Sequence, residues 1–310
     1  MQYKKNSKTS HLLKIATRKS NLAMAQAQIV CDLIEPVPAK LVGMSTPGDE
    51  NLEKPLVEIG GKGVFVKTLE QALLSGIADC AVHSLKDMET QFAQDTQIVS
   101  ILPREDPRDA VLGALSLDAL AINAKVGTAS VRRKAQLLKY RPDLDIQLLR
   151  GNINRRIASL KNKEYDAIIL AVAGLKRLNL DIDYFPIDID IMPPAASQGT
   201  LAVQIFEHHP NIDFIKQTFS RLHCINTSYC VTAERAVLEQ LEGSCRTPIS
   251  AYAYINPSQE LYLRAHVYSP NGEESYTSFA SDKPENAVEL GRKIGQDLLE
   301  KCGGVSFLAS

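Results

Sequence analysis

Short apolar runs alternate with segments of helical periodicity through the first two thirds of the chain. The run Leu12–Thr17 precedes Leu22–Glu35, where apolar residues recur at the spacing of an amphipathic helix. Pro36 and Pro38 mark the end of that helix, and Lys40–Met44 is expected to form a second strand. A strand–helix–strand order of this kind is typical of an α/β fold.

A long polar, glycine-rich stretch at 46–63 interrupts this pattern. It ends in the sequence GGKG, which lacks the spacing of a phosphate-binding loop and favours a flexible lid. A helix is predicted over 64–75, and Asp79–His83 is predicted to form a short buried strand. Open α/β sheets bind ligands at the carboxyl ends of their strands. Ser84, Lys86 and Asp87 follow this strand and are therefore candidate site residues.

The segment 103–109 holds two prolines and five charged residues, and it predicts a crossing between domains. The strand–helix–strand pattern then restarts over 125–178. Its opening resembles the first one, with a Thr and a Ser before a helix that carries an Ala-Gln pair. This weak internal repeat predicts two similar α/β lobes that face each other. A second crossing is expected at 193–199, before a strand at 201–206 that returns to the first lobe.

The last part of the chain has a different order of elements. A helix over 227–241 is followed by predicted strands at 249–255, 261–267 and 275–280, and then by a helix over 284–301. The pattern predicts a small α+β C-terminal domain, a three-stranded sheet with helices.

The fold class is therefore α/β with two lobes and this added domain. The expected division is lobe 1 at 1–103 and 200–223, lobe 2 at 104–199, and the C-terminal domain at 224–310. Residues 1–10 are polar and basic and are expected to be a disordered tail.

Composition narrows the class of function. The net charge of −1 gives no support for nucleic-acid binding. The chain has six cysteines and no C-x-x-C pair, which favours cytoplasmic thiols over a disulfide framework, and its histidines form no metal-binding pattern. No apolar run approaches the ~20 residues that span a bilayer, and the N-terminus does not resemble a signal peptide. We expect a cytoplasmic monomer without a membrane partner.

Arginines cluster where ligands bind in α/β lobes. Helix N-termini favour anions, and arginine adds bidentate recognition of carboxylate or phosphate. Such a cluster predicts a polyanionic ligand, although solvated helix faces and salt bridges between lobes are the alternative. The six arginines at predicted strand ends or helix starts are Arg18, Arg132, Arg133, Arg150, Arg155 and Arg156.

Two further features leave alternatives open. Cys245 lies on a short loop between Gly243 and Pro248, beside Arg246, which would favour the thiolate. From this loop alone it is either a reactive thiol or an inert, half-buried one. Lys86-Asp87 is either a surface ion pair or a carboxylate at the mouth of a cleft, available for proton transfer.

Several stretches of the chain together resemble the porphobilinogen deaminase family. The resemblance runs from about Leu13 to near the C-terminus. The stretches that carry it are IATRKS (15–20), GGKGVF (60–65), AVHSLKD (81–87), REDPRD (104–109), LRGN (149–152), YDAIILA (165–171), VTAERA (231–236) and LEGSCRTP (241–248).

The resemblance implies two lobes like those of periplasmic binding proteins, with the active site between them, and a third domain that carries the cysteine. It also implies a covalent dipyrromethane cofactor, held by a thioether to Cys245. Four porphobilinogen molecules are joined head to tail with loss of ammonia, and hydrolysis releases hydroxymethylbilane. Each pyrrole brings an acetate and a propionate, which agrees with the arginine cluster.

The resemblance also assigns roles residue by residue. Asp87 matches the catalytic carboxylate, which would stabilise the azafulvene cation that forms when ammonia leaves. The cofactor-binding set is Cys245, Lys86, Ser84, Thr128, Ser130, Arg132, Arg133 and Arg150. The substrate-binding set is Arg18, Ser20, Arg150 and Arg156, and the lid residues are Lys62 and Phe65. The chain departs from the family pattern at Glu58, Met88-Glu89, Ala129, Gln204 and Cys230.

Two other classes of protein remain as alternatives. A non-catalytic, two-lobed anion-binding protein would suit the arginines but gives no reason for a cysteine-bearing third domain. An acyl transferase with Cys245 as nucleophile would need a histidine base, and none lies near it in sequence.

Overall fold

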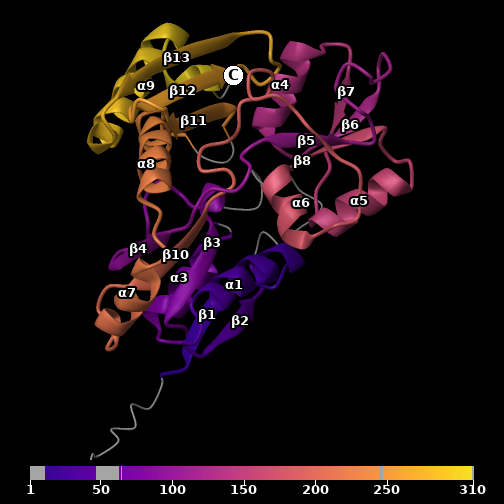
Figure 1. The fold of residues 1–310 in the computed structure, drawn as a ribbon. Coiled ribbons are helices and arrows are strands. Elements are labelled where there is room, and N and C mark those ends of the chain that lie inside the picture. The colour runs from indigo at the N-terminus through magenta and orange to yellow at the C-terminus, as the bar shows by residue number, and fades with distance from the viewer. Residues whose placement is uncertain (1–10, 47–62, 64, 244–246, 309–310) are drawn as a thin grey trace, which may run out of the picture.

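Two five-stranded sheets and one three-stranded sheet make up the computed structural model, which describes residues 11–46, 63, 65–243 and 247–308 (Figure 1). The predicted N-terminal tail, Lys62 and Cys245 lie outside these residues. Mixed α/β architecture with a small third sheet was the predicted fold class, and it is confirmed.

The first sheet has the strand order β2-β1-β3-β10-β4. Its strands are β1 (Leu13–Arg18), β2 (Ala39–Met44), β3 (Cys80–Ser84), β4 (Thr96–Ile101) and β10 (Leu201–Phe206). The parallel neighbours of β1 are β2 and β3, whereas β10 runs antiparallel between β3 and β4. Helices α1 (Asn21–Leu33), α3 (Lys67–Leu74) and α7 (Ile212–Ser220) pack on this sheet, which we call lobe 1.

The second sheet, lobe 2, has the order β7-β6-β8-β5-β9. Its strands are β5 (Asp109–Leu112), β6 (Lys125–Gly127), β7 (Asp145–Gln147), β8 (Ala167–Ala171) and β9 (Phe185–Pro186). Its helices are α4 (Val131–Tyr140), α5 (Ile153–Lys161) and α6 (Val172–Leu178). Strand β9 pairs antiparallel with β5.

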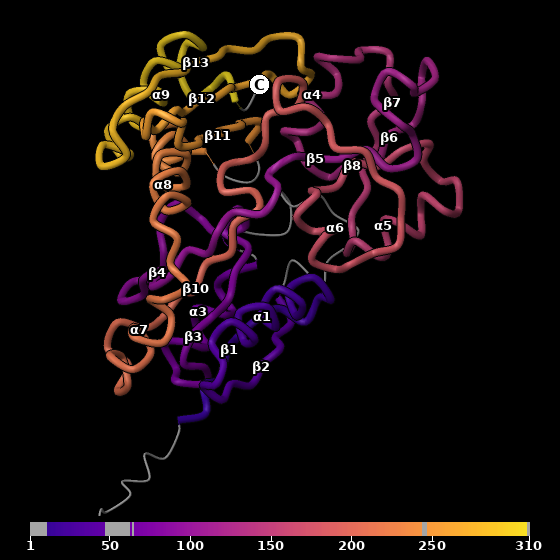
Figure 2. Tube along the Cα trace, viewed as in Figure 1, coloured from indigo at the N-terminus to yellow at the C-terminus, as the bar shows by residue number. Residues whose placement is uncertain are grey.

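The two lobes share one topology, as the internal repeat predicted. In each, three parallel strands are followed in the sheet by an antiparallel strand that enters directly after a crossing between the lobes. The strand that plays this part is β10 in lobe 1 and β5 in lobe 2. The two crossing segments run side by side (Figure 2), and the backbone N–H of Glu105 donates to Gly199 O at 3.1 Å.

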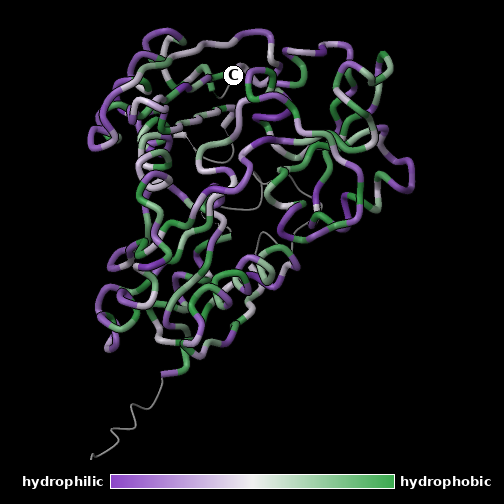
Figure 3. The backbone as a smooth tube through the Cα atoms, in the orientation of Figure 1, coloured by the Kyte–Doolittle hydropathy of each residue, from purple (hydrophilic) through white to green (hydrophobic). Residues whose placement is uncertain are grey.

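The third sheet consists of β11 (Ile249–Ile255), β12 (Leu261–Tyr268) and β13 (Ser275–Asp282). Apolar residues alternate along β11 and β12 and face α8 (Ile225–Gln240) and α9 (Ala287–Cys302). Gly291 allows the two helices to approach, because a Cβ there would lie 2.3 Å from Ala233 O. In Figure 3 this unit shows mixed hydropathy along each strand, as expected for a sheet with one buried face.

A buried ion pair joins the crossing segments to this C-terminal unit. Glu234 of α8 is fully buried, and its carboxylate accepts hydrogen bonds from both Nη atoms of Arg104, each at 2.8 Å. The backbone N–H groups of Ser197 and Ala253 donate to the same carboxylate, both at 2.7 Å. One carboxylate therefore holds both crossings and the first strand of the C-terminal sheet.

Candidate active site

A cavity of about 500 Å³ lies between the two lobes. Its lobe 1 wall is formed by the end of β1, the start of α1 and the 3₁₀ turn η2 (Leu85–Asp87), which follows β3. Its lobe 2 wall is formed by the starts of α4 and α5 and by α6. The cavity therefore opens at the carboxyl ends of parallel strands, where open α/β sheets bind ligands.

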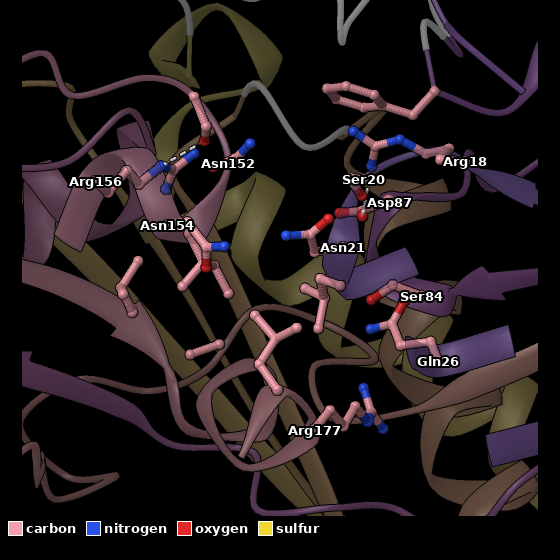
Figure 4. Close-up of a pocket in the computed structure, with 18 of the residues that line it drawn as sticks. Arg18, Ser20, Asn21, Gln26, Ser84, Asp87, Asn152, Asn154, Arg156 and Arg177 are labelled. Carbon is pink, nitrogen blue, oxygen red and sulfur yellow. Dashed lines mark hydrogen bonds and ion pairs between the residues drawn. The ribbon is translucent and has the colours of Figure 1, made fainter. Parts of the chain in front are cut away.

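The sequence at the end of β1 turns the chain into α1 and leaves two polar groups in the cavity. Ser20 is the N-cap of α1, and its Oγ accepts a hydrogen bond from Ala23 N at 3.3 Å. The guanidinium of Arg18 lies 4.1 Å from the centre of the Phe65 ring, and its Nη1 lies 3.9 Å from Asp87 Oδ2. Figure 4 shows Arg18, Ser20 and Asp87 close together on this wall.

Asp87 is the one acidic side chain among the described residues that line the cavity. The turn that carries it is anchored by Leu85, which is 1% exposed and donates its N–H to Thr200 O at 2.9 Å. The side chain of Asp87 is itself 37% exposed. A rigid turn thus presents a carboxylate that a ligand can reach.

Lys86 lies next to Asp87 and points to the segment between the lobes. Its Nζ donates to Gln198 Oε1 at 3.0 Å, and Gln198 Nε2 donates to Asp109 Oδ1 at 2.9 Å. Burial, together with the nearby Arg133, lowers the pKa of Lys86 to about 8. Its ammonium is therefore more easily lost than that of an exposed lysine, and a bound anion would stabilise it.

The lobe 2 wall is rich in cations. Arg133, Arg150, Arg155 and Arg156 all line the cavity. Burial and the positive charges of Arg133 and Arg150 lower the pKa of Arg156 to about 10. Burial also lowers the pKa of Arg150. A bound anion would offset both the repulsion between these guanidinium groups and the cost of their burial, so this wall can hold carboxylates.

A buried carboxylate holds the first of these arginines in place. Asp109 is fully buried and accepts from Arg132 Nη2 and Arg133 Nη2, both at 2.8 Å. Burial alone would raise the pKa of Asp109, but the two arginines outweigh it and hold that pKa well below its usual range. Arg133 also donates to Ile169 O at 3.0 Å.

The structure brings most of the predicted site residues together and places three of them behind the lining. Those that line the cavity are Arg18, Ser20, Phe65, Ser84, Lys86, Asp87, Arg133, Arg150 and Arg156. Arg132 is 4% exposed and bonds to Asp109, Gln136 and Pro193 O, so its charge is used within lobe 2. Thr128 Oγ1 accepts from Ser130 N, and Ser130 caps α4. Cys245 and Lys62, to which the sequence also assigns roles, lie outside the described residues.

Arg177, Asn21 and Gln26 line the cavity as well, and the sequence did not single them out (Figure 4). Arg177 Nη2 donates to Gly199 O at 2.6 Å, and burial lowers the pKa of Arg177 to about 10. Arg177 lies in the last turn of α6. The sequence pattern predicts anion-binding arginines at helix starts and strand ends, so it does not point to Arg177.

Within the described ranges, no group of three or more histidine, cysteine or acidic side chains could hold a metal ion. Among those same residues, no helix is both long and apolar enough to cross a membrane.

Fold and site together define a class: a two-lobed α/β protein with a cation-rich cavity between its lobes and a third domain. Comparison with known proteins gives the family. The family model described as porphobilinogen deaminase, dipyromethane cofactor binding domain, matches residues 13–213, and the porphobilinogen deaminase C-terminal domain matches 228–300. The chain belongs to the porphobilinogen deaminase family, transferases of tetrapyrrole synthesis that use a dipyrromethane cofactor.

Solved structures that resemble this chain include proteins of several bacteria. The BvgS VFT2 domain of Bordetella pertussis is 13% identical, with a TM-score of 0.39, over 68% of this chain and 86% of that chain. A ligand-binding component of an ABC-type import system from Staphylococcus aureus is 11% identical, with a TM-score of 0.39, over 75% of each chain. An arginine-specific periplasmic binding protein of Salmonella typhimurium is 13% identical, with a TM-score of 0.36, over 68% of this chain and 91% of that chain.

The residues present fit the dipyrromethane group. A dipyrromethane with acetate and propionate side chains carries four carboxylates, and the cations that line the cavity include Arg133, Arg150, Arg156 and Lys86. Lys86 and Arg156 have lowered pKa values because they are buried among other cations. An anionic group would offset that cost, which is the observation that favours the fit.

Proposed function

We propose that this chain is a hydroxymethylbilane synthase that joins four porphobilinogen molecules head to tail, with loss of ammonia, and releases the linear tetrapyrrole by hydrolysis. The observation that carries the proposal is the pairing of one reachable carboxylate, Asp87, with a cavity whose other charged lining residues, among those described, are all cations. Anion-binding alone would not need Asp87, because a carboxylate repels an anionic ligand.

The cations bind and orient the substrate. Arg18 and Ser20 on lobe 1, and Arg150 and Arg156 on lobe 2, are proposed to hold the acetate and propionate groups of porphobilinogen. Arg133, Arg150, Ser84 and Lys86 are proposed to hold the cofactor. Thr128, Ser130 and Arg132 support this set from behind the lining: Ser130 caps the helix of Arg133, and Arg132 shares Asp109 with it.

Asp87 performs the recurrent chemistry in this proposal. Its Oδ atoms accept hydrogen bonds from pyrrole N–H groups and stabilise the positive charge that develops on the substrate as ammonia leaves. The same carboxylate takes up or returns a proton during each addition. Arg18, with its Nη1 3.9 Å from Asp87 Oδ2, orients that carboxylate between additions.

Cys245 is proposed to carry the dipyrromethane through a thioether, and Lys62 and Phe65 to cover the site. When bound, the dipyrromethane supplies the pyrrole position to which the first substrate is joined. A monomeric, cytoplasmic enzyme without nucleic-acid or membrane partners remains the prediction, as do domain boundaries near 103, 199 and 223.

Incubation of the purified protein with porphobilinogen tests the function. We expect one ammonia released for each porphobilinogen consumed, with hydroxymethylbilane as the product. A non-catalytic anion-binding protein would bind porphobilinogen without consuming it. Binding without ammonia release by protein that carries the adduct would reject the proposal.

A further inference from the structure

The segment that follows Asp87 is bonded to the start of the turn that carries Phe65. The Oε1 atom of Glu89 accepts a hydrogen bond from the backbone N–H of Gly63 at 2.9 Å. Gly63 is buried and has φ +81, a conformation that favours glycine. A buried backbone N–H needs a partner, and the side chain of Glu89 supplies it.

Both polar backbone groups of Gly63 are thereby fixed. Its carbonyl oxygen accepts from Val66 N at 3.0 Å and from Lys67 N at 3.1 Å, which leads the chain into α3. Phe65 lies within this turn, and its ring is the one that packs against the Arg18 guanidinium at 4.1 Å. The position of Phe65 thus depends on how Gly63 is held.

These contacts form a closed circuit that begins and ends at Asp87. Two residues along the backbone lead from Asp87 to Glu89, and a hydrogen bond leads from Glu89 to Gly63. The turn leads on to Phe65, which stacks on Arg18, and Arg18 Nη1 lies 3.9 Å from Asp87 Oδ2. A change at Glu89 can therefore reach Asp87 without touching substrate.

The backbone at Glu89 has a separate anchor. Arg235 of α8 donates Nη1 to Met88 O at 3.3 Å and Nη2 to Glu89 O. Loss of the Glu89 side chain therefore leaves its main chain bonded to the C-terminal unit. This separates the hydrogen bond to Gly63 from the general placement of the segment.

We propose that Glu89 is a positioning residue that fixes the Phe65 turn and, through Phe65, the place of Arg18 against Asp87. The inference rests on the proposed function for its consequence in catalysis. Its structural part, the placement of Phe65, does not depend on that function.

A fluorescence measurement tests the structural part. The chain has no tryptophan, so Phe65→Trp places a single reporter in the turn. In that background, Glu89→Ala should raise the iodide quenching constant of the tryptophan several-fold. A hydrogen bond to a charged group contributes about 10-fold to 100-fold to an equilibrium. Glu89→Gln keeps an acceptor oxygen and should quench like its parent.

Glu239→Ala is the matched control. A second cavity, of about 590 Å³, is lined by both Glu89 and Glu239. Glu239 is a carboxylate like Glu89, but its ion pair is with Arg292. Its quenching should equal that of the parent. Equal quenching in Glu89→Ala and the parent would overturn the proposal, and so would Glu89→Gln behaving like Glu89→Ala.

Kinetics in the chain with Phe65 intact test the consequence. Glu89→Ala should lower kcat about 10-fold, and Glu89→Gln should restore it. Should Glu89→Ala fail to fold, Glu89→Asp tests the reach of the carboxylate by the same two measurements. An unchanged kcat with raised quenching would reject the catalytic consequence. Quenching is measured without porphobilinogen, so failure of the proposed function leaves the quenching result readable.

Discussion

The two walls of the cavity differ in how their charges are arranged. Lobe 1 presents a mixed set, in which Arg18 and Lys86 flank the carboxylate of Asp87. Lobe 2 presents arginines alone, and the acid that belongs to them, Asp109, is buried behind the wall. In the proposed function, two lobes of one topology therefore have separate tasks. Lobe 2 would hold anionic groups, and lobe 1 would also carry the group that responds to charge that develops during the reaction.

Removal of the lobe 1 carboxylate should have the largest effect. Asp87→Ala should lower kcat by about 10²–10⁴-fold, the range found for loss of a positioned acid–base group. The cofactor adduct or its assembly intermediates should remain, because Asp87 is not an attachment residue. Steady-state consumption of porphobilinogen and the intact mass are the measurements. Near-normal turnover would reject Asp87 as the catalytic carboxylate.

Removal of the buried lobe 2 carboxylate should act on folding instead. Asp109→Asn leaves Arg132 and Arg133 buried without their counter-ion, which should lower the free energy of unfolding by about 3–5 kcal/mol. Urea denaturation measures this change. Asp118→Asn is the control, since Asp118 bonds the Tyr140 hydroxyl at the surface and should change stability little. A loss of less than about 1 kcal/mol would mean that Asp109 is not the structural counter-ion.

Removal of a cavity arginine from lobe 2 should weaken substrate binding more than turnover. Arg156→Gln should raise KM for porphobilinogen about 10-fold to 100-fold, the contribution of one charge-assisted hydrogen bond. Arg292→Gln, which removes an exposed cation of α9, is the control and should leave KM unchanged. A fall in kcat at constant KM would contradict the division of tasks between the walls.

The smallest expected effect is a pH dependence from Lys86. Its pKa of about 8 in the free protein means that its positive charge is lost as pH rises through 8. Lys86 then holds the carboxylates of the cofactor less firmly, so kcat/KM should fall a few-fold above pH 8. Lys86→Arg stays charged and should shift the fall to higher pH. If the pH profile of kcat/KM were identical in the parent and in Lys86→Arg, the fall above pH 8 would belong to another group.

Local patterns predicted much of the fold and of the lobe 1 wall. The apolar run before Arg18 is read directly from neighbouring residues, and the structure has it as β1. The strand before Asp87 was likewise visible as an apolar run that ends in polar residues. Its predicted boundaries differ from β3 by one residue at each end.

Contacts between distant residues could not be predicted in this way. Arg132 and Arg133 are adjacent in sequence and both bond to Asp109, yet only Arg133 lines the cavity. Arg132 also donates to Gln136 and to Pro193 O, and the latter is distant in sequence. Arg177 reaches the cavity from a helix C-terminus, opposite to the rule used to find anion sites. Gln198 bonds Lys86 across more than a hundred positions.

The central claim is that the cation-lined cavity serves a covalently attached dipyrromethane, and intact mass measurement of the purified protein tests it most directly. The account predicts a mass above that of the polypeptide by two porphobilinogen units less two ammonia molecules. Peptide mapping should place this adduct on Cys245, and Cys245→Ala should lack it. Active enzyme with the mass of the unmodified chain would contradict the account.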